Sequence, residues 1–87
     1  MTNHTVAFVG LGYIGLPTAV VMANSGVDVT GVDVNEANVE RINRGEVTIV
    51  EPGLEEELKR ALASGHFRAT TSQVHADTYI IAVPTPF

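Results

Sequence analysis

One glycine-rich segment constrains the fold of this chain more than any other feature. Residues 10–15 read Gly-Leu-Gly-Tyr-Ile-Gly, between the apolar, β-prone residues 6–9 and an apolar run at helical spacing. A second β-prone run follows and ends at Asp33. A glycine-rich turn alone is weak evidence. Strand, glycine turn, helix, strand and acid in this order fit the fingerprint of dinucleotide-binding βαβ units.

Each glycine of the segment has a physical reason to be glycine. Gly10 allows the tight turn from strand to helix, and Gly12, which has no Cβ, allows a diphosphate to approach the backbone. Gly15 allows the helix to lie close to the first strand. The free N–H groups and the positive end of the helix dipole then favour an anion without any lysine.

The boundaries of the first helix can be predicted from two residues. Pro17 falls in its first turn, where the missing N–H of proline costs little. Gly26 follows Asn-Ser and is expected to end the helix in a left-handed conformation. We therefore expect a strand over residues 5–9, a helix over residues 13–25 and a second strand over residues 28–34.

Asp33 is the candidate ligand for the adenosine ribose. It follows Gly15 by 18 residues, close to the spacing of about 20 that is typical of the acid that binds the ribose hydroxyls. A carboxylate at this position repels a 2′-phosphate, so NAD is favoured over NADP.

Composition excludes several other classes of function. The chain has 87 residues, 45% of them apolar, which suits one small folded domain and argues against disorder. A net charge of −5 argues against nucleic acid and acidic membranes as partners. No apolar run approaches the roughly 20 residues of a membrane span, and there is no cysteine. We expect a soluble cytoplasmic protein without a metal site.

The rest of the chain predicts further α/β units. Helices are expected from Asn35 to about residue 45 and over residues 54–64, and strands over residues 67–70 and 77–83. Residues 71–76 are expected to form a turn or short helix. With right-handed crossovers, this pattern gives a Rossmann-type doubly wound parallel sheet of about four strands in the order 3-2-1-4.

The last ten residues resemble a buried strand followed by a loop that has just begun. Nucleotide-binding units of this class usually need more strands, and a dehydrogenase needs a substrate domain. We therefore interpret residues 1–87 as the N-terminal part of an NAD-binding Rossmann domain from a larger enzyme. Exposed apolar surface beside the last strand, and hence self-association, is expected.

Four motifs resemble the nucleotide-sugar dehydrogenases, the UDP-glucose/GDP-mannose dehydrogenase family. Two of them are shared with many NAD enzymes: Gly-Leu-Gly-Tyr-Ile-Gly-Leu-Pro at residues 10–17 and Val-Asp-Val-Asn at residues 32–35. Two are more specific: Ile-Asn-Arg-Gly-Glu at residues 42–46, running on to Glu-Pro-Gly-Leu at residues 51–54, and Ala-Val-Pro-Thr-Pro at residues 82–86. Within the family, the later motifs are most similar to members that oxidise UDP-N-acetyl-D-mannosamine.

The resemblance implies a reaction that this chain alone cannot perform. Family members oxidise a sugar C6 alcohol to a carboxylate with two NAD+ per turnover, using a cysteine, a lysine and an asparagine from later segments. No residue of this chain is assigned a catalytic role. The resemblance also implies a nucleotide-sugar substrate and a homo-oligomer for the parent enzyme.

The resemblance places further residues at the cofactor. Tyr13 and Ile14 would lie at the diphosphate, and Asp33 at the adenosine ribose. Thr85 would face the cofactor where the strand order reverses. The complete set of predicted cofactor contacts is Gly10, Gly12, Tyr13, Ile14, Gly15, Asp33, Val34, Val83, Pro84 and Thr85.

Two other residues bear on this site less directly. Glu51 could order a loop near the cleft, although a role at the start of the third helix is equally compatible with its position. Asn38 departs from the family pattern, because many relatives carry a basic residue there.

Two alternatives share the same βαβ signature. Flavin enzymes and other adenine-nucleotide-binding enzymes use the same turn, so the ligand could be FAD. The second alternative is a non-catalytic regulatory module that binds a nucleotide. The motifs at residues 51–54 and 83–86 favour the dehydrogenase.

Overall fold

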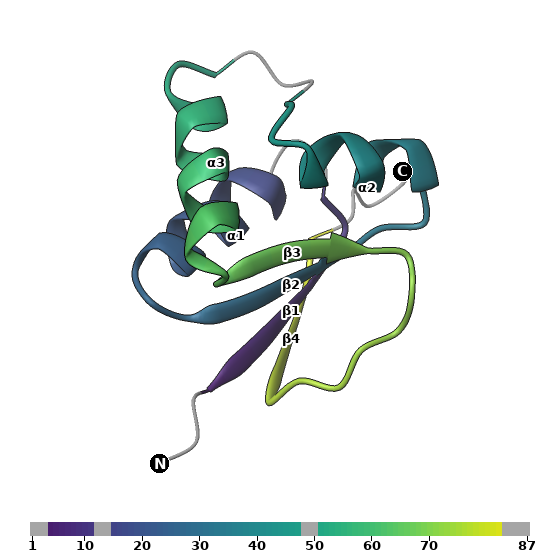
Figure 1. Ribbon diagram of the computed structural model, residues 1–87. Coiled ribbons are helices and arrows are strands. Elements are labelled where there is room, and N and C mark those ends of the chain that lie inside the picture. The colour runs from purple at the N-terminus through teal and green to yellow at the C-terminus, as the bar shows by residue number, and fades with distance from the viewer. Residues whose placement is uncertain (1–3, 12–14, 48–50, 83–87) are drawn as a thin grey trace.

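The computed structural model describes residues 4–11, 15–47 and 51–82 (Figure 1). Its seven elements run, in chain order, β1 (Thr5–Val9), α1 (Gly15–Asn24), β2 (Asp28–Val32), α2 (Glu36–Asn43), α3 (Leu54–Ser64), β3 (Phe67–Thr70) and β4 (Thr78–Ile81). The elements expected from the sequence are all present. The second and fourth strands are shorter than predicted, and residues 71–77 form no helix.

The four strands form one parallel sheet in the order β3-β2-β1-β4, as predicted. Up to β3 the chain adds strands in one direction, and the three helices lie on one side of the sheet (Figure 1). The connection to β4 then reverses direction, and a right-handed crossover must pass over the opposite face. Residues 71–77 make this crossover as an irregular segment without a helix.

The core lies between the helices and the facing side of the sheet. The strand register aligns Val6 with Val29, and Val29 with Phe67, so these side chains form one row on that side. All three are almost completely buried. Leu58 of α3 is fully buried against the same core. Such apolar burial is the main driving force for a domain of this size. No helix of the described residues is long and apolar enough to cross a membrane.

The outer edge of β3 is closed by a side chain. The backbone carbonyl of His66 accepts from Val29 of β2, and that of Thr70 accepts from Asp33 just after β2. The intervening Ala69 therefore faces the open edge. Asn43, at the end of α2, donates from its amide to the Ala69 carbonyl (2.9 Å) and accepts from the Ala69 N–H (2.9 Å). The side-chain amide thus satisfies an edge that would otherwise offer unpaired backbone groups to another strand.

The opposite edge, β4, is left with apolar side chains in solvent. Tyr79 is 51% exposed and Ile81 is 71% exposed. The expected exposed apolar surface beside the last strand is therefore confirmed. Self-association through it stays a prediction.

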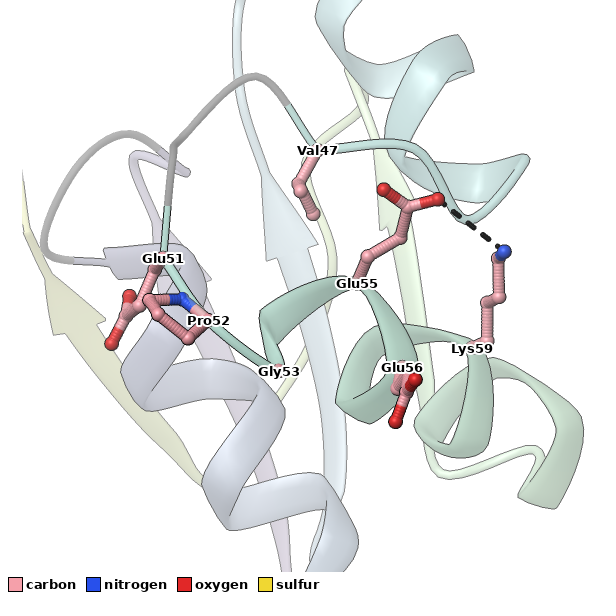
Figure 2. A pocket seen from close by; sticks show the side chains of 7 residues that line it. All are labelled: Val47, Glu51, Pro52, Gly53, Glu55, Glu56 and Lys59. Atoms are coloured by element: carbon pink, nitrogen blue, oxygen red, sulfur yellow. Dashed lines mark ion pairs between the residues drawn. The ribbon is translucent and has the colours of Figure 1, made fainter.

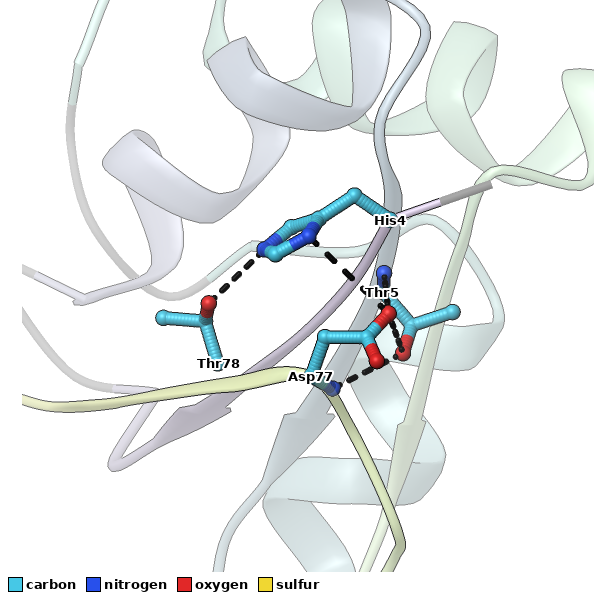
Figure 3. Close-up of polar contacts among 4 residues, drawn as sticks. All are labelled: His4, Thr5, Asp77 and Thr78. Carbon is cyan, nitrogen blue, oxygen red and sulfur yellow. Dashed lines mark hydrogen bonds and ion pairs between the residues drawn. The ribbon is translucent and has the colours of Figure 1, made fainter. Parts of the chain in front are cut away.

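Polar contacts join the beginnings of β1 and β4 (Figure 3). The Thr5 N–H donates to the Asp77 carboxylate (2.9 Å), and the Asp77 N–H donates back to the Thr5 carbonyl (3.0 Å). His4 lies 2.7 Å from the Thr78 hydroxyl and 3.9 Å from the Asp77 carboxylate. The backbone hydrogen bond from Thr5 is the main cause that lowers the pKa of Asp77 below its ordinary value of 3.8.

Asp77→Asn should make the stability of the chain less sensitive to acid. Folding lowers the pKa of Asp77, so its ionised carboxylate stabilises the fold at pH values above the ordinary pKa of 3.8. This contribution is lost as pH falls through the lowered pKa. The asparagine amide keeps an oxygen that accepts from Thr5 but does not titrate. Urea unfolding between about pH 6 and pH 3 measures the difference.

Glu40→Gln, which removes an exposed carboxylate from α2, is the control for this measurement. It should leave the acid dependence close to that of the wild type. An unchanged acid dependence in Asp77→Asn would show that the ionised carboxylate of Asp77 does not stabilise the fold.

Candidate nucleotide-binding site

The predicted site residues gather at the carboxyl edge of the sheet. Gly10 follows β1, Asp33 follows β2, and Gly15 begins α1. The Gly10 N–H donates to the Val32 carbonyl at 2.7 Å, which joins the ends of the two strands. Gly10 has a φ of +99°, which is strained for any residue with a Cβ. The turn predicted for the first glycine is confirmed.

Gly15 brings the first turn of α1 against the end of β1. A Cβ built on Gly15 collides with the backbone carbonyl of Gly10 and lies 3.2 Å from the Cβ of Ala82. The packing role predicted for the third glycine is therefore confirmed. The N-terminus of α1 consequently lies at the edge where ligands of parallel α/β sheets bind.

The N-terminus of α1 differs electrically from those of the other two helices. The first turn of α2 carries Glu36, and that of α3 carries Glu55, Glu56 and Glu57. These carboxylates already complement the positive ends of their own helices. The first turn of α1 has no acidic residue. Its helix dipole is left to attract an anion from outside the chain.

Asp33 is half-buried and held by two backbone groups. Its Oδ2 accepts from the Leu11 N–H (3.0 Å), and its Oδ1 accepts from the Asn35 N–H (3.0 Å). Each carboxylate oxygen can accept a second hydrogen bond. Asp33, the residue proposed from the sequence to bind the ribose, is thus fixed beside Leu11. Its carboxylate oxygens can still accept hydrogen bonds from hydroxyl groups.

The two residues that follow Asp33 lie at the same edge of the sheet. Val34 is 96% exposed, so its apolar side chain is open to a ligand. Asn35 caps α2, because its side chain accepts from the Asn38 N–H at 3.0 Å. The capping role predicted for Asn35 is confirmed.

Several predicted contact residues lie outside the described residues: Gly12, Tyr13, Ile14, Val83, Pro84 and Thr85. Residues next to both groups are described: Leu11 and Gly15 flank residues 12–14, and Ala82 precedes Val83. Ala82 donates its N–H to the Val9 carbonyl at 2.8 Å, so the end of β4 reaches the same edge as Gly10.

Leu11 was not recognised from the sequence as a residue of the site. Its side chain is 1% exposed and lies over Gly31 in β2. A Cβ on Gly31 would lie 2.6 Å from both methyl carbons of Leu11. A glycine inside a strand often marks close approach by another group, and this signal could have revealed the contact.

A hollow of about 620 Å³ at the start of α3 is a different environment (Figure 2). It is lined by Val47, Glu51, Pro52, Gly53, Glu55, Glu56 and Lys59. The ammonium group of Lys59 is 3.3 Å from a carboxylate oxygen of Glu55. Excess negative charge makes this hollow unsuitable for a diphosphate. Within the described part of the chain, no group of three or more acidic or histidine side chains could hold a metal ion.

The fold and the carboxyl-edge site together define a Rossmann-type nucleotide-binding domain. The family model described as "UDP-glucose/GDP-mannose dehydrogenase family, NAD binding domain" matches residues 4–87. The chain belongs to this family, and its cofactor is NAD.

Within this family, the chain is similar to dehydrogenases that are named for N-acetylated sugars. The chain is 54% identical to a UDP-N-acetyl-D-mannosamine dehydrogenase from Salmonella typhi, over 100% of the chain and 21% of that relative. It is 52% identical to an NDP-N-acetyl-D-galactosaminuronic acid dehydrogenase from Ralstonia nicotianae, over 97% of the chain and 20% of that relative. The chain thus spans about one fifth of the curated relatives it matches.

A solved structure shares the fold. The UDP-N-acetyl-mannosamine dehydrogenase of Staphylococcus aureus superposes with a TM-score of 0.90 and 46% sequence identity. The match covers 94% of this chain and 20% of that structure. The predicted fold class is confirmed.

Gly15→Ala should destabilise the fold by about 3 kcal/mol or more, because its Cβ meets a backbone carbonyl that cannot move aside as a side chain can. Gly26→Ala is the matched control. Gly26 has a φ of +101°, but a Cβ there meets nothing within 4 Å, so only the conformational cost of about 1–2 kcal/mol is expected. Urea unfolding compares the two variants. Equal losses would contradict close packing of α1 on the Gly10 turn.

Proposed function

We propose that residues 1–87 are the N-terminal part of the NAD-binding domain of a nucleotide-sugar 6-dehydrogenase. The observation that carries this proposal is that the first turn of α1 has no acid and a carboxylate is fixed at the same edge of the sheet. The tip of α1 attracts the diphosphate, and Asp33 binds the hydroxyls of the adenosine ribose. Both lie at the carboxyl edge of the sheet.

Selectivity for NAD follows from the charge of Asp33. A 2′-phosphate would bring its negative charge against a carboxylate whose position is fixed by two N–H groups. Asn38 supplies no compensating positive charge. The two hydroxyls of the adenosine ribose of NAD, in contrast, can both donate to the carboxylate.

The remaining contacts of the cofactor are assigned from sequence position. We place Val34, which is almost fully exposed, at the adenine side of the ribose. Gly12, Tyr13 and Ile14 are assigned to the diphosphate. Val83, Pro84 and Thr85 follow β4 and are assigned to the cofactor where the strand order reverses.

For the parent enzyme, we propose oxidation of the C6 alcohol of UDP-N-acetyl-D-mannosamine to the uronic acid. The identity of 54% to a UDP-N-acetyl-D-mannosamine dehydrogenase supports this substrate. Bound NAD+ would supply the hydride acceptor. The chain has no cysteine, so the covalent nucleophile expected of the family belongs to another part of the parent, and this chain alone should be inactive.

The cellular setting of the parent follows from the same reasoning. We propose a cytoplasmic homo-oligomer that supplies an activated uronic acid for polysaccharide synthesis. The unpaired edge of β4, with Tyr79 and Ile81 exposed, is the position at which the sheet of the parent would continue. A flavin enzyme or a regulatory module is not favoured, because the matching family model describes an NAD-binding domain.

Calorimetric titration with NAD+, NADP+ and FAD tests this proposal. The wild-type chain should bind NAD+ more tightly than NADP+ or FAD. Asp33→Ala should weaken NAD+ binding by about 1.5–3 kcal/mol, the value of a hydrogen bond to a charged group. It should also narrow the gap to NADP+, because the repulsion of the 2′-phosphate is removed.

Glu36→Ala removes the same charge from the neighbouring helix and should leave NAD+ affinity nearly unchanged. Tighter binding of FAD than of NAD+ would contradict the proposal. An equal effect of the Asp33 and Glu36 variants would remove Asp33 from the site.

A further inference from the structure

Gly31 is a glycine for reasons of space. It lies inside β2, where glycine normally weakens a strand. It is not among the glycines with positive φ, so its backbone conformation does not demand glycine. The space above it is filled by Leu11, whose two methyl carbons lie 2.6 Å from the position of a Cβ on Gly31. The absence of a side chain on Gly31 therefore leaves the space that the Leu11 side chain occupies. We call this contact the Leu11 seat.

We propose that Leu11 is a positioning residue that holds the glycine turn for the diphosphate, with Gly31 as its seat and Asp33 as its second anchor. The inference rests on the proposed function, since it takes the diphosphate subsite from there. It assigns to Leu11 and Gly31 a role in cofactor affinity without contact with the cofactor.

Leu11 is fixed in two independent ways. Its side chain is 1% exposed and packs on β2, and its N–H donates to the Asp33 carboxylate at 3.0 Å. The preceding residue, Gly10, is fixed to the Val32 carbonyl. The turn is therefore attached to β2 at two successive residues before the nucleotide arrives, which reduces the ordering cost of binding.

The other end of the glycine segment is fixed by different contacts. Gly15 packs against the Gly10 carbonyl and Ala82. A displacement of Leu11 therefore changes the spacing between the start of the turn and the tip of α1. Asp33 would lose its hydrogen bond from Leu11, but its other carboxylate oxygen keeps the hydrogen bond from the Asn35 N–H (3.0 Å). Loss of the Leu11 seat should reduce affinity for the diphosphate more than affinity for adenosine.

A double-mutant cycle tests this inference. Gly31→Ala should raise the Kd for NAD+ about tenfold, with the Kd for adenosine changed less than about twofold. Leu11→Ala creates room for the new methyl group. The combined Gly31→Ala/Leu11→Ala variant should therefore bind NAD+ more tightly than Gly31→Ala alone, by about threefold or more.

Two controls separate positioning from stability and from the proposed function. Val29→Ala removes core packing from the same face of β2, at the end away from the turn. It should lower stability without changing the ratio of the NAD+ and adenosine affinities. Hydrogen exchange of the Leu11 amide needs no ligand. The amide should be protected in the wild type and lose protection in Gly31→Ala.

The outcomes distinguish the two proposals. A protected Leu11 amide that becomes exposed in Gly31→Ala, in a chain that does not bind NAD+, would support the attachment of the turn and overturn the proposed function. An unprotected wild-type amide, an additive double mutant, or equal losses of NAD+ and adenosine affinity would each overturn the positioning role of Leu11.

Discussion

The close approach of α1 to the end of β1 is the constraint on which the rest of the structure depends. Gly15 lies against the Gly10 carbonyl at a distance that no side chain would permit. This contact brings the positive end of the helix to the carboxyl edge of the sheet, between the ends of β1 and β4. A displacement of α1 would move its N-terminus away from Gly10 and Ala82 at the ends of these strands.

The site proposed for an anionic cofactor contains no cluster of positively charged side chains among the described residues. The net charge of the chain is −5, and acidic side chains complement the starts of α2 and α3. Only backbone dipoles and N–H groups are required at the start of α1, which carries no acid of its own. In the proposed function, the negative charge of Asp33 discriminates between cofactors, because a carboxylate accepts hydrogen bonds from hydroxyls and repels a phosphate.

Local sequence patterns predicted most of this architecture. The β1-α1-β2 unit, the strand order and the place of Asp33 follow from residues whose conformational demands act over a few positions, such as Gly10, Pro17 and Gly26. The third helix and third strand were also placed correctly, because the apolar spacing of residues 54–64 is strongly helical and Gly65 ends it in a left-handed conformation.

The contacts that refine the site could not be predicted in the same way. The packing of Leu11 on Gly31 and the pairing of Asn43 with Ala69 join residues 20 and 26 positions apart, respectively. Such contacts depend on strand register and on the depth at which a helix packs. The strand expected over residues 28–34 ends earlier, at Val32, which is the last residue of β2 paired with its neighbours.

The most direct test of the account is the NMR amide spectrum of the 87-residue chain, followed during addition of NAD+. We expect the largest shifts on Gly10, Leu11, Gly15 and the residues that follow β2, with the start of α3 unaffected. Shifts concentrated on residues 53–59, beside the acidic hollow of Figure 2, with the Gly10 turn unchanged, would contradict it.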